Sequence, residues 1–85
     1  MTEVTDNPEA HRFELTENGR LAYADYRREP GRLIIDYVFS PPELRGQGTA
    51  GRLMAGLAAS AAARGETIVP VCGYAAAWLR RTPQA

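Results

Sequence analysis

Three glycines lie close together where an apolar stretch of the chain meets an alanine-rich stretch: Gly46, Gly48 and Gly51. Because glycine has no side chain, the main chain at these positions can approach a ligand closely. The first N–H groups of a helix have no intrahelical partner, and the helix dipole adds partial positive charge where they point. A glycine-rich turn that opens a helix therefore predicts an anion site, and the alternative is a turn that only caps the helix.

The spacing of these glycines distinguishes between nucleotide-binding motifs. A P-loop requires Gly-x-x-x-x-Gly-Lys-Ser/Thr, and the chain contains no lysine. Residues 46–51 fit the dinucleotide pattern Gly-x-Gly-x-x-Gly formally. However, 85 residues are too few for the paired halves of a dinucleotide-binding domain, and no acidic residue closes a following strand to hold a ribose. Neither motif accounts for the turn.

Arg45, Gly48 and Ala50 fit a more specific pattern. Their spacing resembles motif A of the GNAT superfamily of N-acetyltransferases, Arg/Gln-x-x-Gly-x-Gly/Ala. The run Pro-Pro-Glu-Leu-Arg-Gly-Gln-Gly and the later Val-Pro-Val-Cys are similar to those of short single-domain members, and the resemblance extends over residues 13–83. It implies transfer of an acetyl group from acetyl-CoA, the cosubstrate, to an amine of unknown identity. The alternative is a non-catalytic module that binds acyl-CoA.

The resemblance also implies where acetyl-CoA lies. In the family the acyl-CoA threads between two strands that splay apart, and the loop amides hold its pyrophosphate. This places the thioester near residues 37–39 and the pyrophosphate over residues 45–50, and Pro41 and Pro42 help the strand to leave the sheet because proline donates no ladder hydrogen bond. The expected binding residues are Tyr37, Val38, Phe39, Arg45, Gly46, Gln47, Gly48, Thr49, Ala50 and Cys72.

Acetyl transfer needs a neutral amine and therefore a base, for which the chain offers few candidates. Asp36 lies inside the most apolar expected strand, where desolvation would raise its pKa. The alternative for Asp36 is a carboxylate at an open face paired with an arginine. His11 lies at the start of the first expected strand and is better explained as a surface residue. The histidine that short family members commonly carry near Asp36 is missing here.

Cys72 and Tyr74 follow the last expected strand, where larger family members often place an acid for the leaving thiolate. Cys72 directly precedes an expected helix, a position that lowers the pKa of a thiol, although an isolated cysteine in a small domain usually packs in the core. The match to the family's Pro-x-Cys-x-Tyr/Phe loop favours a functional thiol that accepts the acetyl group or protonates the CoA thiolate. Tyr74 could also be this acid. The family's His-Pro-Glu-Tyr ending is replaced by residues 82–85, Thr-Pro-Gln-Ala.

The elements that must position these residues follow from periodicity and turn signals. Asn18-Gly19 is a strong hairpin signal, and a helix between two strands predicts a parallel crossover. We expect an α/β (α+β) layer with a minimal GNAT-like fold, preceded by a flexible arm over residues 1–10 and forming one domain over residues 11–85. Its elements are an antiparallel meander of strands at 11–15, 21–27 and 33–39, a long helix at 47–63, a parallel strand at 67–71 and a short helix at 73–81.

Two apolar patterns predict the core. The long helix carries a stripe at helical spacing, made of Ala50, Leu53, Met54, Leu57, Ala58 and Ala61. Simple alternation in the third strand places Leu33 and Ile35 on one face together with Tyr37 and Phe39. Ile34, Asp36 and Val38 then lie on the other face, which predicts a central strand covered on both sides.

Composition excludes several classes of function. Ten acidic residues balance ten basic ones, so there is no electrostatic footprint for nucleic acid or an anionic membrane. One cysteine cannot form an internal disulfide, and no apolar segment approaches the roughly 20 residues that span a bilayer. We expect a cytoplasmic protein without a metal. A core this small gains from a ligand or a second copy, so we expect a monomer or a weak homodimer.

Overall fold

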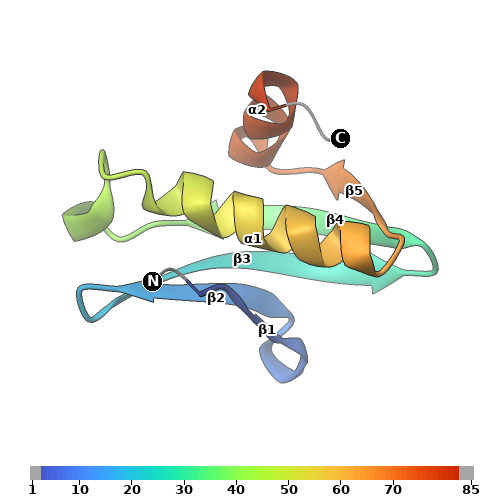
Figure 1. The fold of residues 1–85 in the computed structure, drawn as a ribbon, viewed down its shortest axis with the longest axis horizontal. Helices are drawn as coiled ribbons and strands as arrows, with labels where there is room; N and C mark the ends of the chain where they lie inside the picture. The colour runs from blue at the N-terminus through green and yellow to red at the C-terminus, as the bar shows by residue number, and fades with distance from the viewer. Residues whose placement is uncertain (1–2, 83–85) are drawn as a thin grey trace.

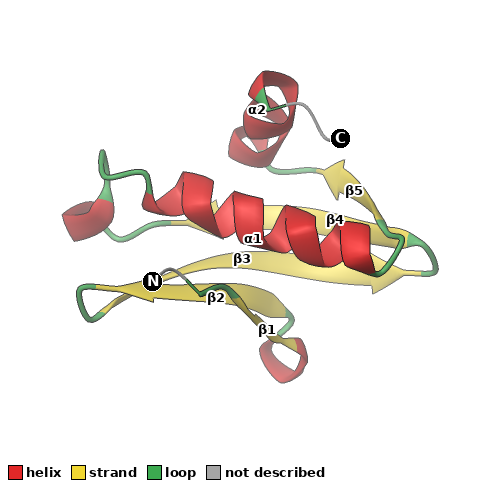
Figure 2. Ribbon diagram, viewed as in Figure 1, coloured by secondary structure: helices red, strands yellow, loops and turns green. Residues whose placement is uncertain are grey.

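A computed structural model describes residues 3–82 as one five-stranded sheet with two α-helices (Figures 1 and 2). The strands follow the order β1-β2-β3-β4-β5, with antiparallel neighbours except for β4 and β5, which are parallel. This is the expected α+β layer. Its elements are β1 (Thr5–Asn7), η1 (Pro8–Ala10), β2 (Arg12–Glu17), β3 (Arg20–Glu29), β4 (Arg32–Phe39), η2 (Pro42–Leu44), α1 (Thr49–Ala63), β5 (Thr67–Pro70) and α2 (Gly73–Arg81).

The hairpin between β2 and β3 has the turn that the sequence predicts. Asn18 and Gly19 have φ values of 50° and 73°, and Glu17 pairs with Arg20 on either side of them. Two consecutive residues with positive φ give the turn a twist that matches the flanking strands. The hairpin brings Glu17 to the end of the sheet where α1 begins, which matters for the site below.

Strand β1 is a correction to the expected flexible arm. Residues 5–7 pair with β2 at the edge of the sheet, and Asp6 accepts hydrogen bonds from the Tyr26 hydroxyl at 2.5 Å and from Arg28 Nη1 at 3.1 Å. Val4 packs against Gly56 of α1, where any β-carbon would overlap it. These contacts are long-range, and a polar three-residue strand carries no periodic signal of its own. Residues 1–2 and 83–85 lie outside the described part of the chain.

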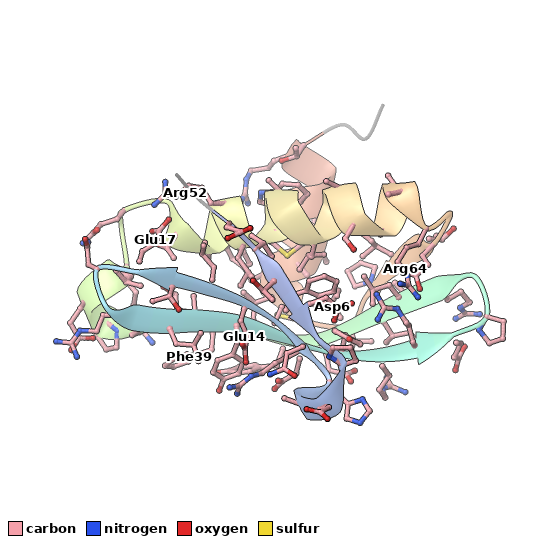
Figure 3. All side chains as sticks on the ribbon, turned by 60° about the horizontal axis from the view of Figure 1, so that its bottom comes forward. Asp6, Glu14, Glu17, Phe39, Arg52 and Arg64 are labelled. Atoms are coloured by element: carbon pink, nitrogen blue, oxygen red, sulfur yellow. The ribbon has the colours of Figure 1, made fainter. Side chains whose placement is uncertain are left out.

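The core lies between the sheet and α1, as the helical stripe predicts. Leu53, Met54 and Leu57 are fully buried, while Ala50 is only partly buried because it lies near the start of the helix. Helix α2 adds Ala75 and Trp78 to the same core. Figure 3 shows both α-helices on one side of the sheet, so within residues 3–82 the other face carries no α-helix.

A β-bulge in β4 overturns the expected alternation. Asp25 pairs with Tyr37 while the next residue, Tyr26, pairs with Ile35, so Asp36 is an extra residue without a direct partner on β3. A bulge inserts one residue and thereby reverses the faces of all side chains that follow it. Simple alternation cannot reveal such an insertion.

The bulge moves Tyr37 and Phe39 to the face without a helix. Val38 instead packs against the core that Leu33 and Ile35 form, because its strand partner is on the core face. The prediction that Tyr37 and Phe39 share a face with Leu33 and Ile35 is therefore wrong. Coverage of β4 on both sides holds only before the bulge, where Ile34 on the opposite face from Leu33 and Ile35 is 4% exposed; beyond the bulge Tyr37 is 49% exposed.

Candidate functional site

The sheet splits between β4 and β5. Their pairing ends at Ile35 and Pro70, where the Ile35 carbonyl accepts from both Val71 N at 2.9 Å and Cys72 N at 3.0 Å. The chain then turns into α2, while β4 continues to Phe39. Beyond Ile35, this edge of β4 has no strand partner among the described residues. The expected splay is therefore present in the fold.

A cleft of about 360 Å³ occupies the split. The last residues of β4, the glycine-rich loop, the first turn of α1 and Tyr74 of α2 enclose it. The cleft brings together all the predicted acetyl-CoA-binding residues except Gln47 and Cys72. Those that line it are Tyr37, Val38, Phe39, Arg45, Gly46, Gly48, Thr49 and Ala50.

The loop at one end of the cleft presents backbone amides. Gly46 and Gly48 have φ values of 80° and 82°, a region that other residues enter only with strain. Gly48 is the N-cap of α1 and supplies no side-chain hydrogen bond, so the first amides of the helix remain available. The side chains of Arg45 and Gln47 hold the loop itself, donating to Ser40 O at 3.0 Å and to Glu43 O at 2.8 Å.

An ion pair that sequence reasoning missed braces this loop. Arg52 in α1 donates from Nε and Nη2 to the two carboxylate oxygens of Glu17 at 2.7 and 2.8 Å, and Figure 3 shows the two side chains meeting. Arg52 Nη2 also donates to Gln47 O at 2.9 Å, and the buried Thr49 hydroxyl donates to Glu17 at 2.6 Å. Nothing in the sequence links Glu17 to a helix that begins 32 residues later.

The third nitrogen of Arg52 points toward the glycine loop. Arg52 Nη1 lies 2.9 Å from where a β-carbon on Gly48 would stand, and it has no hydrogen bond to any residue between 3 and 82. The hydrogen bond with Glu17 raises the pKa of Arg52, so the guanidinium is charged throughout the physiological range. The Arg52 guanidinium therefore lies beside Gly48 and the first amides of α1, although Arg52 itself does not line the cleft.

Asp36 does not have the expected environment. Its carboxylate makes two hydrogen bonds to Arg27, at 2.8 and 2.9 Å, on the helix-free face. The hydrogen bond from Arg27 lowers the pKa of Asp36, and the side chain is one-third exposed, so burial does not dominate. The expected increase in pKa is wrong, and the alternative, an arginine-paired carboxylate, is confirmed. Asp36 does not line the cleft.

Tyr74 and Cys72 differ in how they meet the cleft. Tyr74 lines it, is 37% exposed, and holds its hydroxyl 3.9 Å from where a β-carbon on Gly51 would stand. Cys72 is the N-cap of α2, is partly buried and packs against the hydrophobic core. Its backbone N–H marks the point where the strands part, but its side chain is not part of the cleft lining.

The helix-free face beside the cleft carries an aromatic cluster that the sequence did not reveal. Tyr23 stacks on Phe39 with ring centroids 5.2 Å apart and contacts Tyr37 at 6.4 Å. Asp25, the strand partner of Tyr37, lies on the same face. The bulge at Asp36 creates this arrangement, because without it Tyr37 and Phe39 would point into the core.

Residues 3–82 contain neither a cluster of metal ligands nor a membrane-spanning helix. In that part of the chain, no three histidine, cysteine, aspartate or glutamate side chains are grouped to hold a metal ion. Neither α1 nor α2 has the length and apolar character needed to cross a membrane.

The split sheet, the glycine-rich helix start and the cleft between them are the features that define this small α+β domain. The family model described as GCN5-related N-acetyl-transferase matches residues 12–85. Because this match covers most of the 85 residues, the chain belongs to that family, whose chemistry is acyl transfer. A search among curated proteins finds no match.

Proposed function

We propose that the protein is an N-acetyltransferase that uses acetyl-CoA to acetylate an amine. The observation that carries the proposal is the cleft, which runs from the uncapped first amides of α1 to the unpaired edge of β4. A pyrophosphate fits the first end, because those amides lie there and the charged Arg52 guanidinium lies beside them. An extended amide-containing chain fits the other end, because an open strand edge offers unpaired N–H and C=O groups.

The binding roles follow from this arrangement. The backbone of residues 45–50 holds the pyrophosphate, and Arg52 Nη1 adds one charged hydrogen bond that the fixed Glu17 pair orients. Residues 37–39 line the path of the pantetheine arm and the thioester. The loop is exposed, so the ligand reaches it without any rearrangement of the core.

The reaction forms one C–N bond and breaks one C–S bond. A protonated amine first loses a proton, and its nitrogen lone pair then attacks the acetyl carbonyl carbon. The tetrahedral intermediate expels the CoA thiolate, the nitrogen loses a second proton, and the thiolate gains one. Free CoA and an N-acetylated amine are the products.

Three residues are proposed for the proton transfers. Asp36 is the proposed base, although its lowered pKa makes it a weaker proton acceptor at neutral pH than the sequence implied. Tyr74, which lines the cleft, is the proposed acid for the thiolate. Cys72 is the second candidate for that role or for transient acetylation, and a thioester on Cys72 would distinguish covalent transfer from acid catalysis.

A non-catalytic CoA-binding module is the second candidate function. The pairing of Asp36 with Arg27 favours it, because that pairing weakens as a proton acceptor the one carboxylate that the sequence offers as a base. Both candidates predict CoA binding, and only the first predicts turnover. Cytoplasmic location, a monomer or weak homodimer, and the lack of nucleic-acid or membrane partners remain predictions.

The test separates binding from chemistry. Calorimetry with CoA measures binding, and release of free thiol from acetyl-CoA in the presence of an amine panel measures transfer. Binding together with amine-dependent thiol release supports the transferase. Binding without thiol release for any amine favours the module, and absence of binding would refute both.

A further inference from the structure

The cleft connects the two faces of the sheet. Its lining includes Thr49 and Ala50, which lie at the start of α1 above one face. It also includes Tyr37 and Phe39, which the bulge turns toward the other face. A ligand whose phosphates lie at α1 therefore has its far end accessible from the helix-free face, and a second substrate can approach that end without displacing either helix.

A carboxylate without a partner lies where this second substrate would approach. Asp25 is directly opposite Tyr37 in the β3–β4 ladder, is half-buried, and makes no hydrogen bond or ion pair with any residue in the described range 3–82. Arg12 is its strand partner on the other side. The Arg12 guanidinium instead bonds Glu14 at 2.7 Å and lies 4.8 Å from the centroid of the Tyr23 ring.

The other charges on this face are already paired. Arg27 binds Asp36 with two hydrogen bonds, and Arg12 binds Glu14. Asp25 therefore supplies the unbalanced charge beside the aromatic cluster of Tyr23, Tyr37 and Phe39. A carboxylate next to exposed aromatic rings attracts a cation with an apolar body, because the carboxylate and the ring faces both favour positive charge.

We propose that this surface binds the acceptor, and that the acceptor is a small primary arylalkylamine held as its ammonium ion between Asp25 and the ring of Tyr37. This assignment rests on the proposed transferase function and names its substrate class. Asp25 holds the ammonium form, which must release one proton before the nitrogen attacks. Asp36, which directly precedes the exposed Tyr37, is the proposed base for that proton, and the C–N and C–S bond changes are those given above.

Binding of phenethylamine and of its neutral analogue phenethyl alcohol to the CoA-saturated protein tests the assignment. An exposed charge pair and one cation–π contact together amount to about a tenfold preference for the ammonium compound. Asp25→Asn should reduce that preference to about twofold, leaving only the ring contact. Glu29→Gln removes an exposed charge at the far end of β3 and should leave the preference unchanged.

Several results would overturn the acceptor site: equal binding of the two compounds by the unmodified protein, an unchanged preference in Asp25→Asn, or no binding of either compound. Acetylation of a lysine-containing peptide but not of phenethylamine would overturn the choice of a small amine. A separate titration of the protein with CoA alone keeps the two proposals distinguishable. Loss of the amine preference refutes the acceptor site, whereas absence of CoA binding refutes the proposed function.

Discussion

The ion pair between Glu17 and Arg52 gives a test in which a positioning role and a purely electrostatic role of Glu17 predict opposite changes in CoA affinity. If Arg52 donates to a phosphate through Nη1, Arg52→Gln removes one charged hydrogen bond. Such bonds contribute about 1.5–3 kcal/mol when desolvated, and exposed ion pairs about 0.2–1 kcal/mol. Arg52 is 42% exposed, so about 1 kcal/mol is appropriate, which corresponds to about a fivefold increase in the Kd for CoA.

Glu17→Gln separates positioning from charge. Glu17 is an anion close to the expected phosphate site, so a purely electrostatic effect would make its neutralisation tighten CoA binding. If the carboxylate instead holds the guanidinium over Gly48, the variant loses that geometry and CoA binds about twofold more weakly. We expect weaker binding, because Glu17 fixes Nε and Nη2 of Arg52 and leaves Nη1 directed at the loop.

Isothermal titration calorimetry with CoA at fixed salt measures both effects. Arg64→Gln is the matched control, because Arg64 is an exposed arginine at the other end of α1 with a single weak pair to Glu66 at 3.5 Å. This control should bind CoA as the unmodified protein does. Tighter binding by Glu17→Gln would refute the positioning role of Glu17, and an unchanged Kd for Arg52→Gln would refute the phosphate contact.

Three further predictions concern other parts of the site. Gly48→Glu places a carboxylate in the glycine-rich loop at a position with positive φ. CoA binding measured by calorimetry should therefore be lost, while circular dichroism shows a folded protein. Unchanged affinity would mean that the loop only caps the helix. CoA should slow alkylation of Cys72, because the thiol follows the point where the strands part, and equal alkylation rates would place it outside the site. Arg27 lowers the pKa of Asp36, so their pairing stabilises the fold at pH values above the ordinary carboxylate pKa, and this stabilisation is lost as the pH falls through the lowered value. Asp36→Asn should therefore flatten the acid dependence of the free energy of unfolding measured in urea. An unchanged dependence would contradict the pairing.

The sequence predicts the parts of the fold that local patterns determine. The Asn18-Gly19 turn, the apolar stripe of α1 and the parallel strand after it each depend on residues adjacent in the chain, and the structure contains all three. Strand β1 depends on Asp6 meeting Tyr26 and Arg28, which are separated from it by 20 and 22 residues. No local pattern contains that information, so the arm was expected to be flexible.

The candidate site shows the same division between local and long-range information. The glycine loop is a local signal, and it lines the cleft as expected. The bulge at Asp36 is one inserted residue in an otherwise regular strand, yet it moves Tyr37 from the core face to the open face. That single change assembles the aromatic cluster and makes Tyr37, in place of Asp36, the strand partner of Asp25. The proposed acceptor side of the site therefore follows from strand register and not from any motif. A variant that restores regular pairing in β4 would therefore disturb acceptor recognition more than CoA binding.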